Sequence, residues 1–522
     1  MTWDAIVIGS GFGGAMAAHP LVHAGHRVLM LERGGWVARG PDNWGARGAG
    51  LVTAHYTLES PYYVTAGGHH HRMGSWNCVG GQSVFYGGAS FRFRERDFTH
   101  NAEIVGDSGA EWPIRYDDLE PFYTLAEQLL GVSGDSGEDP TEPWRSGPYP
   151  QRAAPLAPSA QAIADAASRL GLRPSRIPLA IGYEANESRR GCIRCGSCDG
   201  YACAAEAKND IASAIIPELV RRGMSLRTNT VCVRLVRSGS RITGVECVNR
   251  VTGERETVSA RRIVLGAGTL ATPHLLLASE LAPVNPAAGA VGRCLTRHRN
   301  VVVFGIHVRR PNPEREFDKQ VAILDFYDAA GSIQQMSPPL GLVRAYLPRV
   351  VRGPASLVMS HAASLVVIAE DQPRPENGVG VDWSATDRYG LPTLRVQHDY
   401  STRDEAAAAL LVREARRVLR EAGARFTFVH RIETFSHALG TVRMGRDDRT
   451  SPLDECGRYR GLDNLYVVDG SALPRSAGVN PSLTIAANAL RIGAYLARSS
   501  LPPRGRSLRV LSRHTRPPMS LR

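Results

Sequence analysis

A histidine and an asparagine in the last fifth of the chain could together take the proton from a hydroxyl group. His437 precedes mostly small residues (438–441), which leave room for a ligand beside its ring. Imidazole has a pKa near neutrality and is the commonest general base. Asn480 can donate to and accept from a substrate oxygen, and Gly478 and Pro481 would fix the turn that presents it. The pair predicts hydride removal from an alcohol carbon, because that step also requires the hydroxyl proton to leave. The alternative is structural, since a lone histidine usually has no catalytic role.

A glycine-rich turn near the N-terminus predicts a bound dinucleotide. The apolar strand Trp3–Ile8 opens into Gly9-Ser-Gly11-Phe-Gly13-Gly14, a helical stretch follows, and the strand Arg27–Leu31 ends at Glu32. In such a unit the turn glycines let the backbone approach a pyrophosphate, and the helix N-terminus offers free N–H groups. The Glu32 carboxylate can accept from ribose hydroxyls and disfavours a 2′-phosphate, so NADP is not expected.

Four cysteines lie within twelve residues. Cys192, Cys195, Cys198 and Cys203 have the spacing C-x2-C-x2-C-x4-C, close to the ligand spacing of ferredoxin-like iron–sulfur clusters. A four-cysteine zinc site usually pairs two separated C-x2-C units, which this compact run does not do. Three interpretations stay open: an iron–sulfur cluster, structural thiols or disulfides, and zinc.

Regular elements must position these groups. Residues 40–100 are rich in glycine, histidine and aromatic residues, and we expect a strand-poor loop wrapped around a ligand. Residues 225–236 and 241–249 predict a hairpin. Residues 300–400 alternate polar and apolar in short runs, as in an antiparallel sheet, and a helix over 403–422 leads into the C-terminal part.

Five separated motifs resemble those of the glucose–methanol–choline (GMC) oxidoreductase family. They are the N-terminal glycine turn, Val79–Gly88, Val264–Ser279, His437–Gly445, and Leu465–Ser471 with Gly478–Thr484. The third motif departs from the family pattern at Glu280, where glycine is usual. The motifs span residues 3 to about 497, nearly everything but the tail. The resemblance is closest to the branch with cholesterol oxidase and pyranose oxidase, which has asparagine rather than a second histidine before the proline of the last motif.

The resemblance implies a bound FAD and assigns the catalytic roles to His437 and Asn480. The residues expected to bind FAD are Gly9, Gly11, Gly14, Glu32, Gly80, Gly81, Ser83, Cys232, Gly268, Asp469, Gly470 and Pro481. Asp469 and Gly470 would contact the ribityl–pyrophosphate part, and Pro481 the isoalloxazine ring. Members with covalent flavin have a histidine where this chain has Phe85. A phenyl group cannot attack the flavin, so we expect FAD to be bound without a covalent bond.

The expected fold class is α/β, with a Rossmann-like FAD-binding lobe and an antiparallel-sheet substrate-binding lobe, similar to GMC enzymes and p-hydroxybenzoate hydroxylase. We expect residues 1–299 to form the first segments of the FAD lobe, with a connection and the cysteine-rich segment in 131–210. Residues 300–430 would form the substrate lobe, 431–498 the final FAD segment, and 499–522 a basic tail.

Composition argues for an ordinary enzyme rather than a nucleic-acid-binding protein. The formal charge is +12, but only Lys208 and Lys319 are lysines and the arginines are spread along the chain. The chain has no 18-residue apolar run, so we expect no membrane span. Met1 runs almost directly into an apolar strand, and we expect a cytoplasmic protein with reduced thiols.

We therefore expect a sugar- or aminocyclitol-like hydroxyl to be oxidised to a carbonyl by hydride transfer to flavin N5. Polar residues at 69–72 and His361 would line the pocket and favour this substrate over a sterol, which is the alternative. A flavin-binding protein without redox turnover is a distant alternative, against which His437 and Asn480 argue. An iron–sulfur cluster would direct electrons to a one-electron carrier; without it, oxygen is the expected acceptor.

Overall fold

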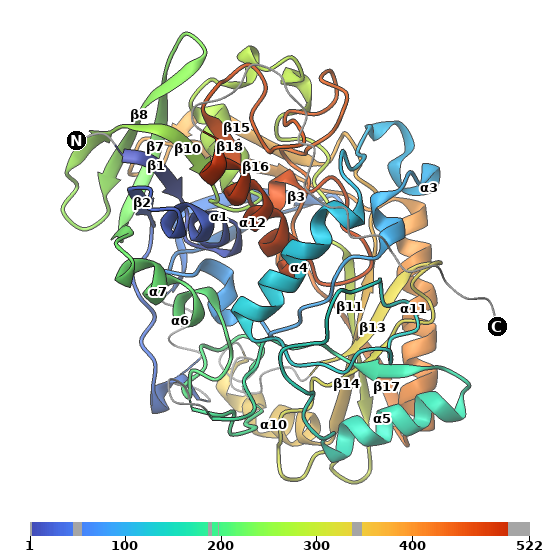
Figure 1. Cartoon of the computed structure of the whole chain (residues 1–522). Coiled ribbons are helices and arrows are strands. Elements are labelled where there is room, and N and C mark those ends of the chain that lie inside the picture. The colour runs from blue at the N-terminus through green and yellow to red at the C-terminus, as the bar shows by residue number, and fades with distance from the viewer. Residues whose placement is uncertain are drawn as a thin grey trace.

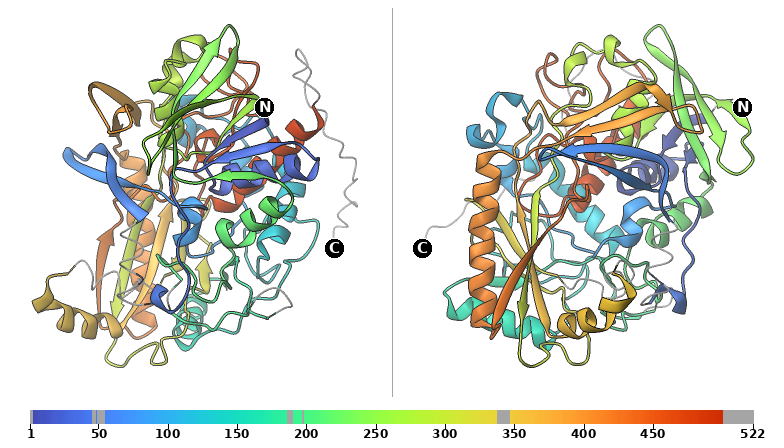
Figure 2. Two further views of the ribbon diagram at one scale, coloured as in Figure 1. Left: turned by 90° about the vertical axis from the view of Figure 1, so that its left-hand side faces the viewer. Right: turned by 180° about the vertical axis from the view of Figure 1, so that it is seen from behind.

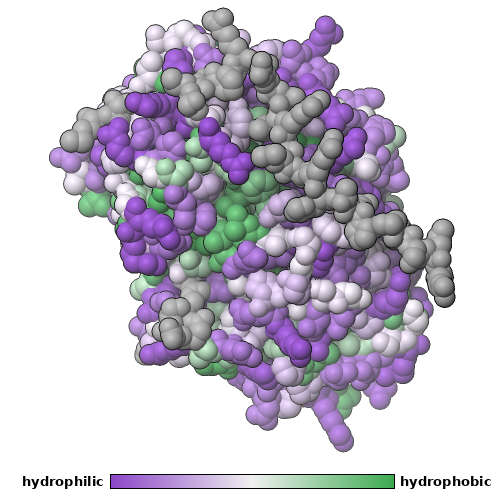
Figure 3. Space-filling view, in the orientation of Figure 1, coloured by the Kyte–Doolittle hydropathy of each residue, from purple (hydrophilic) through white to green (hydrophobic). Residues whose placement is uncertain are grey.

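The computed structural model describes residues 3–44, 48, 55–185, 190–196, 198–336 and 347–499 (Figure 1). The predicted basic tail lies outside these residues except for Ser499. Among the described residues, no helix is long and apolar enough to cross a membrane. The face drawn in Figure 3 is mostly hydrophilic, with a hydrophobic area near its centre.

A parallel sheet of five strands forms the first half of the core. Its order is β18 (Leu465–Val467), β10 (Ala260–Leu265), β1 (Trp3–Ile8), β2 (Val28–Leu31) and β6 (Ser225–Arg227). The central strands are apolar and almost wholly buried, as expected for a sheet covered on both faces.

Helices cover one face of this sheet. α1 (Phe12–His23) packs against α12 (Ser482–Arg498), and α12 also contacts α4 (Tyr116–Leu130) (Figure 1). A separate sheet of β7 (Thr230–Ser238), β8 (Arg241–Asn249) and β9 (Arg255–Val258) contacts β10 and β2.

The predicted hairpin over residues 225–249 exists, but its first strand is shorter than expected. The run 225–236 splits at Asn229, whose φ of 52° is left-handed. Its first part, β6, joins the parallel sheet, and only β7 pairs with β8.

A six-stranded sheet forms a second core. Its order is β17 (Phe426–Arg431), β11 (Arg299–Ile306), β14 (Ala362–Ala369), β13 (Gly331–Gln335), β12 (Val321–Ile323) and β5 (Pro174–Arg176). All its pairs are antiparallel. The long helix α11 (Thr402–Glu421) packs on β11 and β14 through its buried face (Figure 2). The predicted helix over 403–422 is therefore confirmed.

The expectation of a strand-poor loop over residues 40–100 is wrong. β3 (Tyr56–Ala66) and β4 (His69–Trp76) form an antiparallel hairpin joined by Gly67 and Gly68, which have φ of 55° and 76°. Two consecutive glycines with positive φ suit a tight hairpin turn. The hairpin joins β15 (Gly378–Thr386) and β16 (Pro392–Gln397) in a four-stranded sheet. Residues 56–76 therefore form regular β-structure and not the expected loop.

Candidate active site

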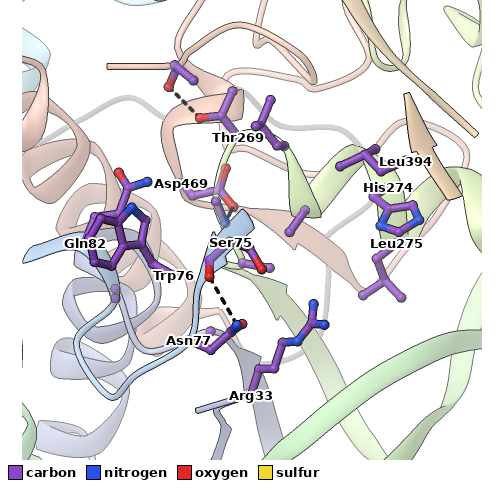
Figure 4. A pocket seen from close by; sticks show the side chains of 18 of the residues that line it. Arg33, Ser75, Trp76, Asn77, Gln82, Thr269, His274, Leu275, Leu394 and Asp469 are labelled. Carbon is purple, nitrogen blue, oxygen red and sulfur yellow. Dashed lines mark hydrogen bonds between the residues drawn. The ribbon is translucent and has the colours of Figure 1, made fainter. Parts of the chain in front are cut away.

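One cavity of about 710 Å³ brings together motifs that are far apart in the sequence. Figure 4 shows side chains from separate parts of the chain, among them Trp76, His274 and Asp469, around it. The expected site residues that line it are Gly9, Gly11, Glu32, Gly81, Ser83, Cys232, Gly268, His437, Asp469, Gly470 and Pro481. Gly14, Gly80 and Asn480 are not among the residues that line the cavity.

The glycine turn after β1 is packed tightly on one side and open on the other. Gly9 has a φ of 97°, and a Cβ there would lie 2.3 Å from the Gly266 carbonyl oxygen. A Cβ on Gly14 would lie 1.9 Å from the Gly9 oxygen. At Gly11, in contrast, the nearest atom to a Cβ would be 4.0 Å away. The absence of a side chain at Gly11 therefore leaves an open space at the start of α1. A phosphate group could occupy such a space.

Glu32 directly follows β2, lines the cavity and accepts three hydrogen bonds from the protein. One carboxylate oxygen accepts from the Ser10 backbone N–H (3.1 Å) and hydroxyl (2.6 Å), and the other from the Gly34 N–H (2.8 Å). Burial raises the pKa of Glu32, and these donors oppose the shift. A carboxylate has about four acceptor positions, so the protein donors leave capacity for a ribose hydroxyl.

The Val79–Gly88 motif is tied to the glycine turn. The Gly80 N–H donates to the Ser10 hydroxyl oxygen at 2.9 Å, and the Ser83 hydroxyl donates to the Gly80 oxygen at 2.6 Å. Ser83 also accepts from the Ile211 N–H at 3.1 Å. The hydroxyl of Ser83 therefore holds the shape of this loop, which forms the short helix η2 (Gly81–Phe85).

Asp469 follows β18 and joins two loops. Its carboxylate accepts from the Gly268 N–H (2.9 Å) and the Thr272 hydroxyl through one oxygen. The other oxygen accepts from the Ser471 N–H (2.9 Å) and hydroxyl (2.6 Å). Asp469 thus fixes Gly268 and Gly470 at the cavity wall, a role that the motif alone did not indicate.

His437 and Asn480 lie side by side although 43 residues separate them. The Asn480 side-chain nitrogen is 3.4 Å from His437 Nε2, and the Asn480 oxygen is buried without a hydrogen-bond partner. Burial lowers the pKa of His437 well below its ordinary value, and the charges of His298 and Lys319 act in the same direction. The imidazole is therefore neutral at physiological pH and can accept a proton.

Aromatic and aliphatic side chains form much of the remaining wall. They come from the β3–β4 hairpin, β16 and the loop before His437, namely Tyr56, Tyr62, Met73, Trp76, Leu394 and Phe435. Sequence reasoning missed them because the hairpin was not recognised, although the Gly67-Gly68 pair was a usable signal.

The predicted polar pocket residues do not line the cavity. His69, His70 and Arg72 are exposed on β4. His361 follows α10 (Arg352–Ser360), and its Nδ1 lies 3.3 Å from the His307 carbonyl oxygen. These residues therefore say nothing about the substrate.

The models of the GMC oxidoreductase family match residues 4–300 and 373–489. The chain belongs to the GMC oxidoreductase family. The 6‴-hydroxyparomomycin C oxidase of Streptomyces lividus is 32% identical over 95% of this chain and 91% of its own. The paromamine 6′-oxidase of Streptomyces fradiae is 31% identical over 98% of this chain and 93% of its own. The crystal structure of pyridoxine 4-oxidase from Mesorbium loti has the same fold, with a TM-score of 0.64 at 20% identity over 95% of this chain and 99% of its own.

The expected family and fold class are thus confirmed. GMC oxidoreductases bind FAD, and this member is an oxidoreductase that acts on the CH–OH group of an alcohol. The cavity with its glycine turn suits that cofactor, since the open face of Gly11 and the acceptor capacity of Glu32 lie on its lining.

The four clustered cysteines of this GMC oxidoreductase converge outside the main cavity. Cys192, Cys195, Cys198 and Cys203 line one small space of about 10 Å³. Backbone N–H groups donate to two of the sulfurs, from Arg194 to Cys192 at 3.3 Å and from Lys208 to Cys203 at 3.5 Å. Among the residues whose placement is described, no three of these sulfurs lie within 4.8 Å of one another.

Lys208 connects the cysteines to the loop at the main cavity. Its buried ammonium donates to the carbonyl oxygens of Tyr86 (2.7 Å), Cys198 (3.0 Å) and Tyr201 (2.7 Å). The Gly200 N–H donates to the Phe85 oxygen at 2.9 Å. The cysteine segment therefore packs directly behind η2.

Replacing Glu32 with alanine should weaken FAD binding without changing the chemistry of enzyme that stays loaded. A hydrogen bond to a charged group is worth about 1.5–3 kcal/mol, which corresponds to a rise in Kd of about 10- to 150-fold. Titration of apoenzyme with FAD, followed by fluorescence quenching, measures it. Glu256→Ala is the control, because that carboxylate is exposed and pairs with Arg227. An unchanged Kd in Glu32→Ala would show that Glu32 does not hold the cofactor.

Proposed function

We propose that this enzyme oxidises a hydroxyl of a sugar- or aminocyclitol-like substrate to a carbonyl, with His437 as the base. The observation that carries the proposal is the neutral imidazole of His437 on the cavity lining, with the side-chain nitrogen of Asn480 only 3.4 Å from its Nε2. FAD, when bound, supplies the acceptor for the hydride.

The protein's part in the reaction is to bind the alcohol and move its proton. The Asn480 side-chain N–H can donate to an alcohol oxygen that lies beside His437 Nε2. Asn480 thereby holds the hydroxyl at His437, whose Nε2 takes the proton as the hydride leaves the carbon. Because the hydroxyl is already held at the base, proton transfer does not require a separate bimolecular encounter.

The cavity supports non-covalent binding of FAD. Gly9, Gly11 and the N-terminus of α1 would hold the pyrophosphate, Glu32 the ribose, and Pro481 would lie at the flavin ring. Phe85, at the position of the attachable histidine, is buried and packs on Trp76 with ring centroids 4.7 Å apart. A phenyl ring offers no nucleophile for attachment.

The substrate class rests on the relatives that match most of the chain. Two of them are named as oxidases of paromamine and of 6‴-hydroxyparomomycin C, both of which carry sugar-like hydroxyls. Polar groups at the cavity, including Gln82, Thr386, Asp387 and Thr393, offer partners for such a substrate. Cholesterol oxidase of Mycobacterium tuberculosis is only 23% identical over 98% of this chain, so a sterol is the second candidate.

We further propose that the four clustered cysteines hold an iron–sulfur cluster. Tetrahedral zinc with Zn–S bonds of about 2.3 Å requires its sulfurs to be about 3.8 Å apart, which no three of the cysteines satisfy among the described residues. The two N–H···S contacts and the buried ammonium of Lys208 suit a negatively charged cluster. The space of about 10 Å³ that the four cysteines line is smaller than such a cluster. A cluster held by these cysteines would supply single-electron chemistry next to η2, whose residues line the main cavity.

Anaerobic mixing with paromamine should bleach the flavin absorbance, whereas cholesterol in detergent should not. The polar groups at the cavity can form hydrogen bonds with the hydroxyls of a sugar. With a sterol bound, the same groups would remain without hydrogen-bond partners, which costs free energy. Stopped-flow absorbance of the FAD-loaded enzyme measures both. Reduction by cholesterol alone would transfer the proposal to the sterol class, and reduction by no alcohol tried would overturn redox turnover itself.

His437→Ala should keep FAD but slow flavin reduction by substrate about 10²–10⁴-fold, the usual contribution of a general base. Asn480→Ala should slow it by a smaller factor, and His361→Ala, outside the cavity, should not. Because the pKa of His437 lies well below its ordinary value, the wild-type rate should stay flat through neutral pH and fall only in acid, as the imidazole becomes protonated. A His437→Ala variant with the wild-type rate would remove this histidine as the base.

Protein purified without oxygen should contain iron and acid-labile sulfide and should prefer one-electron dyes to oxygen. Cys195→Ser should lose iron, because it removes one of the four thiolates, whereas Cys456→Ser, a buried thiol elsewhere, should not. Metal analysis and sulfide release measure the content. Neither iron nor sulfide in the wild type would disprove the cluster, and zinc alone would make the cysteines a structural clamp and oxygen the expected acceptor.

A further inference from the structure

His298 touches the proposed base and belongs to none of the sequence motifs. Its Nδ1 lies 3.0 Å from Nδ1 of His437, and the two rings meet edge to face with centroids 5.1 Å apart. The residue is 1% exposed. One of its ring nitrogens is therefore in direct contact with the proposed base.

The other nitrogen of His298 determines which form of the ring is present. Nε2 lies 3.0 Å from the carbonyl oxygens of Ser476 and of Ala477. Carbonyl oxygens only accept, so Nε2 must carry the hydrogen. Burial lowers the pKa of His298, which favours the neutral ring with a lone pair on Nδ1. The geometry on the far side of His437 agrees, because the Asn480 side-chain nitrogen is a donor and lies 3.4 Å from His437 Nε2, which must then be the acceptor.

We infer that His298 is a positioning residue that holds His437 in the form with hydrogen on Nδ1 and a free lone pair on Nε2. With Nδ1 of His298 able only to accept, the shared 3.0 Å contact requires His437 to donate from Nδ1. Neutral imidazole has one N–H, so Nε2 of His437 is then unprotonated. That atom is the one beside Asn480, where the alcohol would bind.

The inference rests on the proposed role of His437 as the base. In the reaction the substrate O–H bond breaks and an N–H bond forms at His437 Nε2, leaving a positive charge on the imidazole. The Nδ1–H of that imidazolium keeps its acceptor in His298, so the proton remains at Nδ1 throughout. If the atom facing His437 Nδ1 were a donor, His437 would carry its hydrogen on Nε2. That nitrogen could then not accept the proton of the alcohol.

The backbone of His298 is held in an uncommon conformation. Its φ is 60°, and its N–H donates to a carboxylate oxygen of Asp371 at 3.0 Å, while Tyr400 donates its hydroxyl to the His298 carbonyl at 2.8 Å. Asp371 also accepts from the Ser476 hydroxyl at 2.8 Å. A left-handed non-glycine residue persists only where its surroundings fix it, and these bonds do so.

Two variants separate the hydrogen-bond role from the structural one. His298→Gly removes the acceptor and suits a φ of 60°. His298→Asn also tolerates this φ and places a carbonyl oxygen near the former Nδ1. We expect the glycine variant to reduce its flavin about 10- to 100-fold more slowly, by analogy with the loss when the hydrogen-bond partner that orients a metal-binding histidine is removed. Its apparent Kd for substrate should not change. The asparagine variant should keep most of the rate, and added imidazole should partly restore the glycine variant.

Anaerobic stopped-flow reduction of FAD-loaded variants gives the rate and the apparent substrate Kd separately. Nitrogen-15 NMR of histidine-labelled protein should show His437 with hydrogen on Nδ1, its signals being those that disappear in His437→Ala. Equal losses in the two variants, or a wild-type rate in His298→Gly, would overturn the inference. These results are distinct from failure of the base assignment, which requires His437→Ala to react at the wild-type rate.

Discussion

Backbone-to-backbone contact between three glycine-containing segments is the constraint on which the site depends. A Cβ on Gly266 would lie 2.6 Å from the Gly14 nitrogen, and one on Gly13 would lie 2.6 Å from the Val468 oxygen. The turn after β1 can meet the segments after β10 and β18 only because these positions lack side chains. Their meeting places Gly268 and Asp469 at one cavity, with His437 on the same lining. A single added methyl group would separate elements that are hundreds of residues apart in the chain.

Buried charge around the base is balanced by hydrogen bonds rather than by solvent. Burial acts to raise the pKa of Asp371, but the neighbouring His398 and His298 and the hydrogen bond from the Arg297 N–H together outweigh it, so the pKa lies below its ordinary value. The same carboxylate fixes the backbone N–H groups of Arg297 and His298. An anion thus stands behind the pair of histidines, where it can offset the positive charge that a proton on His437 would bring.

Much of the fold and part of the site could be predicted from the sequence. The glycine turn, Glu32 and the last motif have spacings that depend on local backbone geometry, so their places on the cavity could be anticipated. The β3–β4 hairpin was missed because residues 40–100 as a whole are rich in glycine, although the tyrosine, threonine and valine residues of β3 and the two-glycine turn after it favour a hairpin. His298 could not be found, because its role arises from a left-handed backbone and from partners 139 to 179 residues away. The partners of Asp469 likewise depend on tertiary contacts.

The order of strands has a consequence for how such an enzyme can change. The parallel sheet takes strands from both ends of the chain, and the sheet around the cavity pairs β3, early in the chain, with β16, more than three hundred residues later. No single cut in the polypeptide separates one sheet from the others. Recombination with one crossover therefore cannot exchange the cavity wall as a unit while retaining the glycine turn. New substrates must be accommodated by substitutions within the existing walls.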